Sequence, residues 1–219
     1  MPHPQRLLVT ELFHSIQGES THAGRPCFFV RCARCPMRCR WCDTAYSFHG
    51  GTPMDVDEVM EAVRASGCRL VELTGGEPLA QPAAAVLAAR LLEERFEVLV
   101  ETGGYFPLSR FPRGVCWILD VKCPASGMAD KNHWPNLEHL DPEKDEVKFV
   151  VADHADYRWS LDVIRQYQLA DRTRAVLFSP VWGELDPADL AAWILRDRVP
   201  ARLQIPLHKV IWGPDRHGV

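Results

Sequence analysis

The sequence predicts an α/β protein in which helices cover a parallel sheet of about six strands. Short apolar runs rich in β-branched residues recur along the chain between turn signals, and several are followed by segments with helical periodicity. This alternation is typical of βαβ units, whose helices pack on a parallel sheet. With 219 residues, the chain is long enough for one such domain and too short for two comfortable ones, so we expect a single domain over residues 1–219.

The expected strands are the short apolar segments bounded by turn signals. Six of them would form the sheet, at residues 28–31, 70–74, 97–101, 117–121, 146–151 and 174–178. A last strand is expected over residues 202–211.

Helical patterns cover fewer segments than strand patterns do, namely residues 54–66, 82–96, 155–167 and 186–198. In the last of these, Asp186 is expected at the N-cap and Pro187 at the first helical position. The alternation lapses at residues 102–114 and 124–144, which are rich in Pro, Gly and polar residues. Long loops of this kind are usually functional or mobile.

Bulk composition excludes several classes of function. Apolar residues make up 47% and charged residues 25% of the chain, which is ordinary for a soluble globular protein. A net charge of −4 argues against a general nucleic-acid or membrane-surface binder, since both need a basic face. Residues 1–13 lack the layout of a signal peptide, and no apolar run approaches the ~18 residues of a membrane span. We therefore expect a cytoplasmic protein with no nucleic-acid or membrane partner.

The eight cysteines are the most informative residues. Disulfides are rare in a reducing cytosol, so clustered cysteines indicate metal or redox chemistry. Five of the eight lie between Cys27 and Cys42, a density that core packing does not require. Cys68, Cys116 and Cys123 are scattered, and the first two are expected to be small buried apolar residues.

Cys35, Cys39 and Cys42 form a C-x3-C-x2-C pattern. These spacings let a tight loop wrap three thiolates around one iron–sulfur cube, and thiolates are soft donors that suit such a cluster. Three ligands for four irons leave one iron open to bind a substrate or cofactor. Cys32 offers an alternative, a C-x2-C-x3-C-x2-C zinc site, but such sites normally separate their cysteine pairs by about a dozen residues or more. The cluster is therefore favoured, with Cys32 as a buried residue or a substitute ligand.

Other motifs surround this triad. Ser15-Ile-Gln-Gly-Glu19 precedes it and Cys42-Asp-Thr44 closes it. Phe28-Phe-Val-Arg31 also precedes the triad, and further motifs follow it at residues 74–78, 101–103, 120–126, 145–148 and 207–212. The triad resembles that of radical S-adenosylmethionine (SAM) enzymes, and the whole order, over nearly the full chain, resembles the 7-carboxy-7-deazaguanine synthase family. Cys32 and the Arg34-Cys-Pro segment depart from the family pattern, and neither departure removes a cluster ligand.

The resemblance implies a pared-down, partial parallel β-barrel, a [4Fe-4S] cluster on the triad, and SAM bound to the open iron. In the family, one electron cleaves SAM to a 5′-deoxyadenosyl radical that abstracts hydrogen from 6-carboxy-5,6,7,8-tetrahydropterin. The ring contracts, ammonia leaves and 7-carboxy-7-deazaguanine forms while SAM is regenerated, a step of queuosine biosynthesis. An external electron donor such as flavodoxin is implied, and Mg²⁺ and a homodimer are expected. The alternatives are a glycyl-radical activating enzyme, which acts on a partner protein, and a non-catalytic zinc module.

The resemblance also implies roles for single residues. SAM is expected to contact Trp41, Cys42, Asp43, Gly76, Glu77, Lys122, Ser126 and Ser179. The pterin substrate is expected to contact Ile16, Gln17, Gly18, Arg31, Thr74, His208 and Val219. Thr44 is expected to bind Mg²⁺ when substrate is present.

Several of these residues have a structural alternative. Residues 74–78 could be an ordinary strand-to-helix turn, and Arg31 could be a solvated strand residue. Thr44 could cap the loop backbone, and the tail that ends at Val219 could be frayed. Strand alternation could point Lys148 away from the site.

Overall fold

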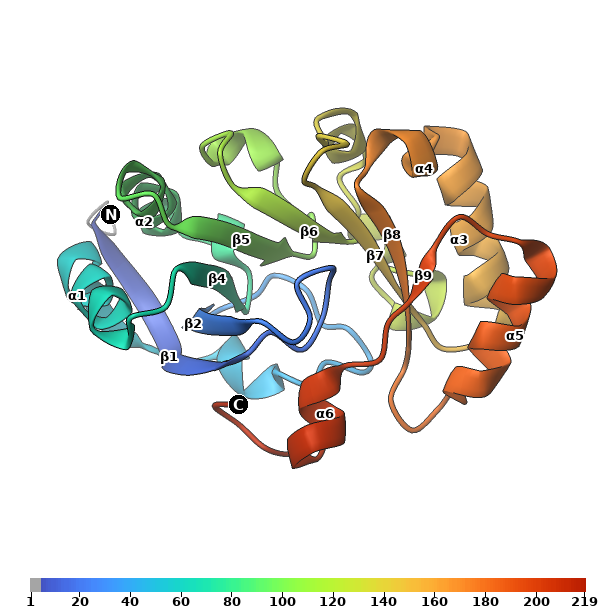
Figure 1. Cartoon of the computed structure of the whole chain (residues 1–219), viewed down its shortest axis with the longest axis horizontal. Helices are drawn as coiled ribbons and strands as arrows, with labels where there is room; N and C mark the ends of the chain where they lie inside the picture. Colours follow the sequence, from blue (N-terminus) through green and yellow to red (C-terminus); the bar gives the residue numbers. More distant parts are fainter. Residues whose placement is uncertain (1–4) are drawn as a thin grey trace.

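The computed structural model describes residues 5–219, and a curved sheet of nine strands runs through it (Figure 1). Residues 1–4, part of the segment read for a signal peptide, lie outside the described residues. The strand order is β3-β1-β2-β4-β5-β6-β7-β8-β9, so the sheet stays open between β3 and β9. Six central strands run parallel, namely β2 (Pro26–Cys32), β4 (Leu70–Gly75), β5 (Glu97–Thr102), β6 (Cys116–Asp120), β7 (Glu146–Val151) and β8 (Ala175–Pro180). The predicted α/β class and its six parallel strands are confirmed.

The central strands carry apolar side chains on their outer face and polar ones on their inner face. In β7, Val147, Phe149 and Val151 are fully buried in the outer core, whereas Lys148 faces inward. In β4, Leu73 packs in the outer core while Thr74 faces inward. Each fully buried apolar side chain stabilises the fold by about 1.5–3 kcal/mol. Period-two alternation therefore leaves the inner face of the sheet free for polar side chains.

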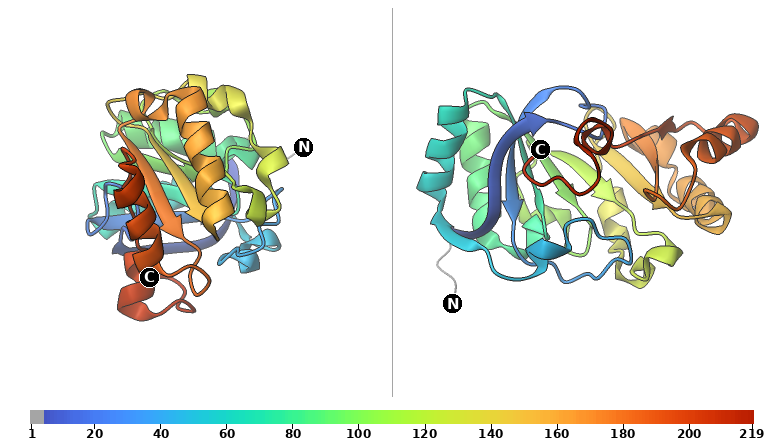
Figure 2. Two further views of the ribbon diagram at one scale, coloured as in Figure 1. Left: turned by 90° about the vertical axis from the view of Figure 1, so that its right-hand side faces the viewer. Right: turned by 90° about the horizontal axis from the view of Figure 1, so that it is seen from below.

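Helices cover the outer face (Figures 1 and 2). They are α1 (Val56–Ser66), α2 (Pro82–Glu93), α3 (His154–Tyr167), α4 (Leu169–Arg172) and α5 (Pro187–Asp197). The predicted start of α5 is confirmed, since Ala188 N donates to the Asp186 carboxylate at 2.8 Å and Pro187 is the first helical residue. Short 3-10 turns occupy the connections, including the two long predicted loops: η1 (Ala45–Phe48), η2 (Pro78–Ala80), η3 (Leu108–Arg110), η4 (Pro124–Ser126), η5 (Ala129–Lys131) and η6 (Trp134–Glu138).

Two strands were not predicted from the sequence, and the bounds predicted for the last strand were wrong. The antiparallel strands β1 (Arg6–Ile16) and β3 (Thr52–Asp55) extend the sheet beyond β2. β1 is mostly half-buried and β3 has only four residues, so neither gives a strong apolar pattern. The strand expected over 202–211 is only β9 (Arg202–Leu203), followed by the helix α6 (Leu207–Trp212). Pro206 stands just before α6 and cannot donate to a strand ladder.

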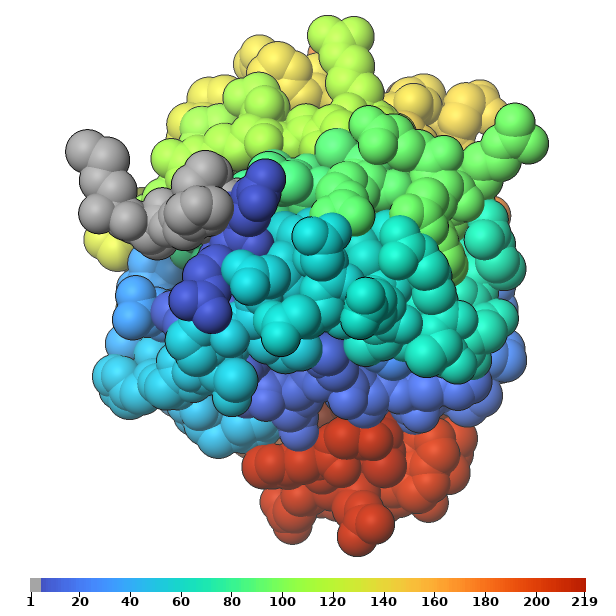
Figure 3. Space-filling view, turned by 90° about the vertical axis from the view of Figure 1, so that its left-hand side faces the viewer, coloured from blue at the N-terminus to red at the C-terminus, as the bar shows by residue number. Residues whose placement is uncertain are grey.

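The C-terminal segment lies against the N-terminal strands, on the side of the sheet that carries the loop after β2 (Figures 1 and 3). Leu207 N donates to Gly18 O at 2.9 Å, which ties the start of α6 to the turn after β1. Within residues 5–219, none of the helices combines the length and apolar character needed to cross a membrane.

Candidate active site

The polar inner face of the sheet lines a cavity of about 680 Å³. That volume lies in the range typical of small-molecule sites. Each of the six parallel strands contributes at least one polar residue. Six of these, one from each strand, are Arg31, Thr74, Glu101, Asp120, Lys148 and Ser179, and all but Lys148 lie within two residues of the strand's carboxyl end. Carboxyl ends of parallel strands are where such barrels place their ligands.

The three cysteines of the triad open into this cavity from the loop after β2. Cys35, Cys39 and Cys42 are half-buried and line it, whereas the other five cysteines are buried elsewhere. Cys32 is fully buried at the end of β2. Three thiols around one opening fit a cluster that takes one thiolate on each of three irons.

The zinc alternative requires the thiols to converge on one point. Among residues 5–219, no three His, Cys, Asp or Glu side chains are placed to hold a single metal ion. Cys32 is also fully buried and does not open into the cavity with the triad, which disfavours the four-thiolate site.

Burial favours the neutral form of two of the three triad thiols. It raises the pKa of Cys35 to about 11 and also raises that of Cys39, while the nearby Lys122 ammonium acts in the opposite direction on both pKa values. A bound metal would deprotonate a coordinating thiol outright. Cluster binding at this loop would therefore release the thiol protons.

Backbone hydrogen bonds hold the triad loop in place. Arg34 N donates to Ser47 O at 2.7 Å, and Glu77 N donates to Arg34 O at 2.8 Å. Arg34 has a φ of 70°, a left-handed conformation that costs a non-glycine residue about 1 kcal/mol or more. In the same loop, Arg40 N donates to Ser126 O at 3.0 Å.

The Gly75-Gly76 pair lets the triad loop approach β4. Gly75 has a φ of 110°, and a Cβ there would meet the Cys32 backbone at 2.5 Å. A Cβ on Gly76 would overlap the backbone of Arg34. Both glycines line the cavity. The segment is therefore a close-packed turn between cluster loop and sheet.

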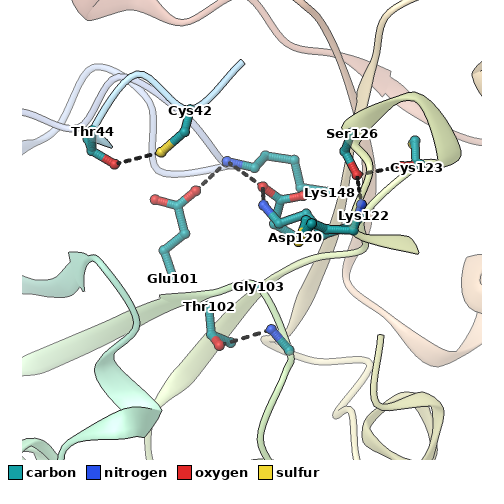
Figure 4. Close-up of polar contacts among 12 residues, drawn as sticks. Cys42, Thr44, Glu101, Thr102, Gly103, Asp120, Lys122, Cys123, Ser126 and Lys148 are labelled. Atoms are coloured by element: carbon teal, nitrogen blue, oxygen red, sulfur yellow. Dashed lines mark hydrogen bonds and ion pairs between the residues drawn. The ribbon is translucent and has the colours of Figure 1, made fainter. Parts of the chain in front are cut away.

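Two residues expected at SAM have their polar atoms turned into the protein. Glu77 is fully buried and accepts from Thr102 Oγ1 at 2.7 Å, Leu79 N at 3.0 Å and Gly103 N at 3.1 Å, so its carboxylate anchors the turn. Ser126 Oγ donates to Cys123 O at 2.6 Å and is not in the cavity lining (Figure 4). The other residues expected at SAM line the cavity: Trp41, Cys42, Asp43, Gly76, Lys122 and Ser179.

A charge network that the sequence did not predict crosses the inner face (Figure 4). Lys148 is only 5% exposed, and its Nζ donates to Glu19 Oε2 at 2.8 Å, pairs closely with Glu101 and lies 3.9 Å from Asp120 Oδ2. Lys122 Nζ donates to the same Asp120 oxygen at 2.7 Å. The inward orientation of Lys148 settles the alternative left open by strand alternation.

The opposite charges of Lys148 and Glu101 stabilise each other's ionised form. Burial alone would lower the pKa of Lys148, but the Glu101, Glu19 and Asp120 carboxylates outweigh it and raise that pKa well above its usual value. Burial would raise the pKa of Glu101, but the two lysines hold it below its usual value. Lys148 and Glu101 are therefore a permanent ion pair. Asp120 Oδ1 is buried without a hydrogen-bond partner in residues 5–219, which leaves one acceptor free for a ligand.

Gln17 is locked by two hydrogen bonds. Its Nε2 donates to Glu72 in a short contact, and its Oε1 accepts from Glu19 N at 2.9 Å. Burial and the neighbouring Glu101 and Glu19 carboxylates raise the pKa of Glu72 well above its usual value, which favours its neutral form. Glu72 is a carboxyl group in the middle of an apolar strand, a signal that could have marked it from sequence.

Arg31 lies in the cavity lining and is held by Glu11. Its Nε donates to Glu11 Oε2 at 2.8 Å, and Tyr46 OH donates to the same oxygen at 2.8 Å. With Nε occupied, the two terminal nitrogens of Arg31 remain for a ligand. Thr74 donates to Glu101 Oε2 at 3.1 Å.

The C-terminal segment forms one wall of the cavity. His208 and Val219 line it together with Ile16, Gln17 and Gly18. A Cβ at Gly18 would overlap the His208 ring, so the glycine allows α6 to seat there. Burial lowers the pKa of His208, so the ring is neutral at neutral pH.

Two further contacts fasten this wall to the triad loop. Lys209 Nζ pairs with Asp43 Oδ2 at 2.6 Å. The His217 ring stacks on Tyr46 with centroids 4.2 Å apart. The tail therefore has defined contacts up to the cavity.

Thr44 lies at the mouth of the cavity and makes no capping hydrogen bond with its side chain. Its Oγ1 lies 3.7 Å from Cys42 Sγ (Figure 4). The loop is instead closed by Ser47 Oγ, which donates to Thr44 O at 2.7 Å. The Thr44 hydroxyl is thus available to a ligand.

Comparisons with known proteins identify the family of this chain. Residues 30–115 match the family model of the radical SAM superfamily. The chain is 46% identical to the 7-carboxy-7-deazaguanine synthase of Chlorobaculum tepidum, over 97% of both chains. It is 42% identical to the enzyme of that name from Koribacter versatilis, over 96% of this chain and 99% of the relative. The fold is similar to that of QueE from Escherichia coli, with a TM-score of 0.76 at 21% identity over 93% of this chain and 95% of the other. This chain therefore belongs to the 7-carboxy-7-deazaguanine synthase family of the radical SAM superfamily.

Proposed function

We propose that this protein converts 6-carboxy-5,6,7,8-tetrahydropterin to 7-carboxy-7-deazaguanine and ammonia. The observation that carries the proposal is that the three triad thiols and the six strand-borne polar side chains share one cavity. The full-length similarity to relatives named for this product supports it. The alternatives of a glycyl-radical activating enzyme and a zinc module have no comparable support.

The proposed cofactors are a [4Fe-4S] cluster and SAM, which the radical SAM superfamily implies. Cys35, Cys39 and Cys42 would hold the cluster. Bound there, the two cofactors would supply the one-electron chemistry that abstracts hydrogen from the substrate. The SAM-facing wall would consist of Trp41, Cys42, Asp43, Gly76, Lys122 and Ser179.

The remaining residues of the cavity suit a carboxylated pterin. The free guanidinium nitrogens of Arg31 match a substrate carboxylate. The carboxyl oxygens of Glu101 and Glu19 offer acceptors to ring N–H groups. His208, the turn at 16–18 and Val219 would bound the ring on the side of the tail. A site built for these hydrogen bonds would reject analogues that lack them.

Thr44 is proposed to bind Mg²⁺ together with the substrate. Mg²⁺ takes six hard oxygen ligands and keeps several waters. The Thr44 hydroxyl makes no backbone cap, and Asp43 next to it could hold metal-bound waters. The remaining oxygens would come from the substrate, so metal and substrate would tighten each other's binding by the same factor.

The proposal also covers the electron donor, the oligomeric state and the cellular compartment. The cluster would receive its electron from an external one-electron donor such as flavodoxin. The exposed Val210, Ile211 and Trp212 of α6 support a homodimer. A cytoplasmic setting is proposed because clustered cysteines that bind a metal centre suit a reducing compartment.

Anaerobic turnover tests the proposal. The reconstituted protein is incubated with SAM, a chemical reductant and the carboxytetrahydropterin, and the products are read by mass spectrometry. We expect a product lighter than the substrate by one ammonia, none of it with Cys39→Ala, and an undiminished yield with Cys68→Ala, which changes a cysteine outside the cavity. A parent enzyme that carries a full cluster and SAM but leaves the pterin unchanged would refute the proposal.

A further inference from the structure

The outer side of the triad loop carries a row of arginines. Residues 34–40 hold three arginines and no acidic residue, in a chain whose net charge is −4. Arg34, Arg38 and Arg40 are exposed, whereas Cys35 and Cys39 between them face the cavity. The loop thus presents its thiols to the cavity and keeps Arg34 and Arg38 outside the cavity lining, whereas Arg40 is exposed and also lines the cavity.

Two of the three charges are not neutralised. Arg40 pairs with Glu184, with nitrogen–oxygen distances of 2.7 and 3.2 Å. Arg38 donates to Cys35 O and Met37 O, both at 2.7 Å, and these are neutral acceptors. Neither Arg34 nor Arg38 forms an ion pair with any carboxylate in residues 5–219. The nearby Asp43 is already engaged by Lys209, so a net positive charge remains at this surface.

Stability does not account for Arg34. Its left-handed backbone is fixed from both sides, by Ser47 O and Glu77 N, so it cannot relax to an ordinary conformation. A glycine would adopt this conformation without strain. Arg95 and Arg198 are also left-handed, but they lie at the ends of α2 and α5, where such a residue terminates a helix. Arg34 therefore keeps a strained backbone conformation, and its charged side chain makes no ion pair that would offset the strain.

We propose that Arg34 and Arg38 form the docking face for an acidic one-electron carrier protein. The inference rests on the proposed function, which requires an electron to enter the cluster from outside. The arginines lie on the same seven-residue loop as two of the three thiols, so a carrier bound to them stands next to the cluster site. Transient electron-transfer complexes bury little surface and rely on charge complementarity for their rate of encounter. The carrier gives up one electron and is oxidised by one, and this protein gains one.

The test is the rate of cluster reduction by a reduced flavodoxin, an acidic flavoprotein, measured by stopped flow without oxygen. Arg34→Gly and Arg38→Gln should each slow the reaction about three- to tenfold at low salt, and added salt should narrow the difference from the parent. Arg34→Lys, which keeps the charge, should retain most of the rate. Arg158→Gln, on the exposed face of α3, is the matched control and should not differ from the parent.

A second reductant separates docking from damage to the loop. Reduced methyl viologen is a small cation, so removal of an arginine should leave its rate unchanged or raise it. Arg34→Gly should also keep the parent's iron content and should not lower the melting temperature, because it relieves backbone strain.

The outcomes are distinct. A protein that binds no cluster contradicts the proposed function itself. A protein that viologen reduces normally, but whose Arg34 and Arg38 variants react with flavodoxin as fast as the parent, contradicts the docking face alone. The same conclusion holds if flavodoxin does not reduce the parent, or if the variants slow viologen and flavodoxin equally.

Discussion

Replacement of Lys148 by methionine is the change that most directly tests the charge network of the cavity. Lys148→Met keeps the length of the side chain and removes the ammonium that faces Glu19, Glu101 and Asp120. At an effective dielectric constant of about 20, unit charges 2.8 Å apart attract by about 6 kcal/mol, and charges 3.9 Å apart by about 4 kcal/mol. Desolvation offsets much of this attraction, so removal of one partner is expected to cost about 3–5 kcal/mol of unfolding free energy.

The loss of stability in Lys148→Met should also depend on pH, in a direction set by the pKa of Glu101. In the parent, the pKa of Glu101 is held below its usual 4.5, so its contribution to stability is present above pH 4.5 and is lost only as pH falls through the lowered pKa. In the variant, burial is no longer opposed by Lys148, and the folded-state pKa of Glu101 rises above 4.5. Folding of the variant then favours protonated Glu101, and this contribution is lost as pH rises through the raised pKa.

Urea unfolding at about pH 5 and about pH 8 measures this difference. The stability deficit of Lys148→Met should be smaller at the lower pH. Lys131→Met, which removes an exposed lysine paired with Asp130, should behave as the parent at both pH values. The reasoning is refuted if Lys148→Met loses less than about 1 kcal/mol, or if its deficit is the same at both pH values.

Three further changes test single residues of the site. Alanine at Cys35, Cys39 or Cys42 should abolish iron binding after reconstitution, whereas Cys32→Ala should keep it, as measured by iron analysis. A cluster in Cys39→Ala, or loss of the cluster in Cys32→Ala, would overturn the assignment. Thr44→Ala should lose stimulation by Mg²⁺ while retaining cluster and SAM binding, and Thr44→Ser should keep part of it; a Thr44→Ala enzyme that responds to Mg²⁺ like the parent would make Thr44 a purely structural residue. Deletion of residues 216–219 removes His217 from Tyr46 and Val219 from the cavity, so KM for the pterin should rise about tenfold with iron content unchanged; unaltered kinetics would show that the tail does not bind substrate.

The sequence predicted the six parallel strands because each is a short apolar run between turn signals. It did not predict β1, whose half-buried residues give a weak pattern, or β3, which has four residues. It also made α6 part of a strand. Leu207–Trp212 is too short for periodicity to distinguish helix from strand, and its conformation depends on Gly18, which lies far away in sequence.

Prediction of the site was strongest where spacing alone carries the chemistry. The triad is local, so its shared opening into the cavity could be anticipated from three cysteines. The Lys148 network could not, because its members come from the turn after β1 and from β5, β6 and β7 and meet only when the sheet curves. Likewise, the sequence did not show that the Glu77 carboxylate accepts hydrogen bonds from Thr102 and Gly103, or that Arg31 donates a hydrogen bond to Glu11.

The central claim is that this cavity performs a ring contraction with SAM as a regenerated cofactor. The most direct measurement is an anaerobic reaction with SAM limiting, in which 7-carboxy-7-deazaguanine and ammonia are quantified against SAM consumed. The account predicts equal amounts of the two products, in excess over the SAM supplied. Cleavage of SAM without either product, or product that appears equally with Cys39→Ala, would contradict it.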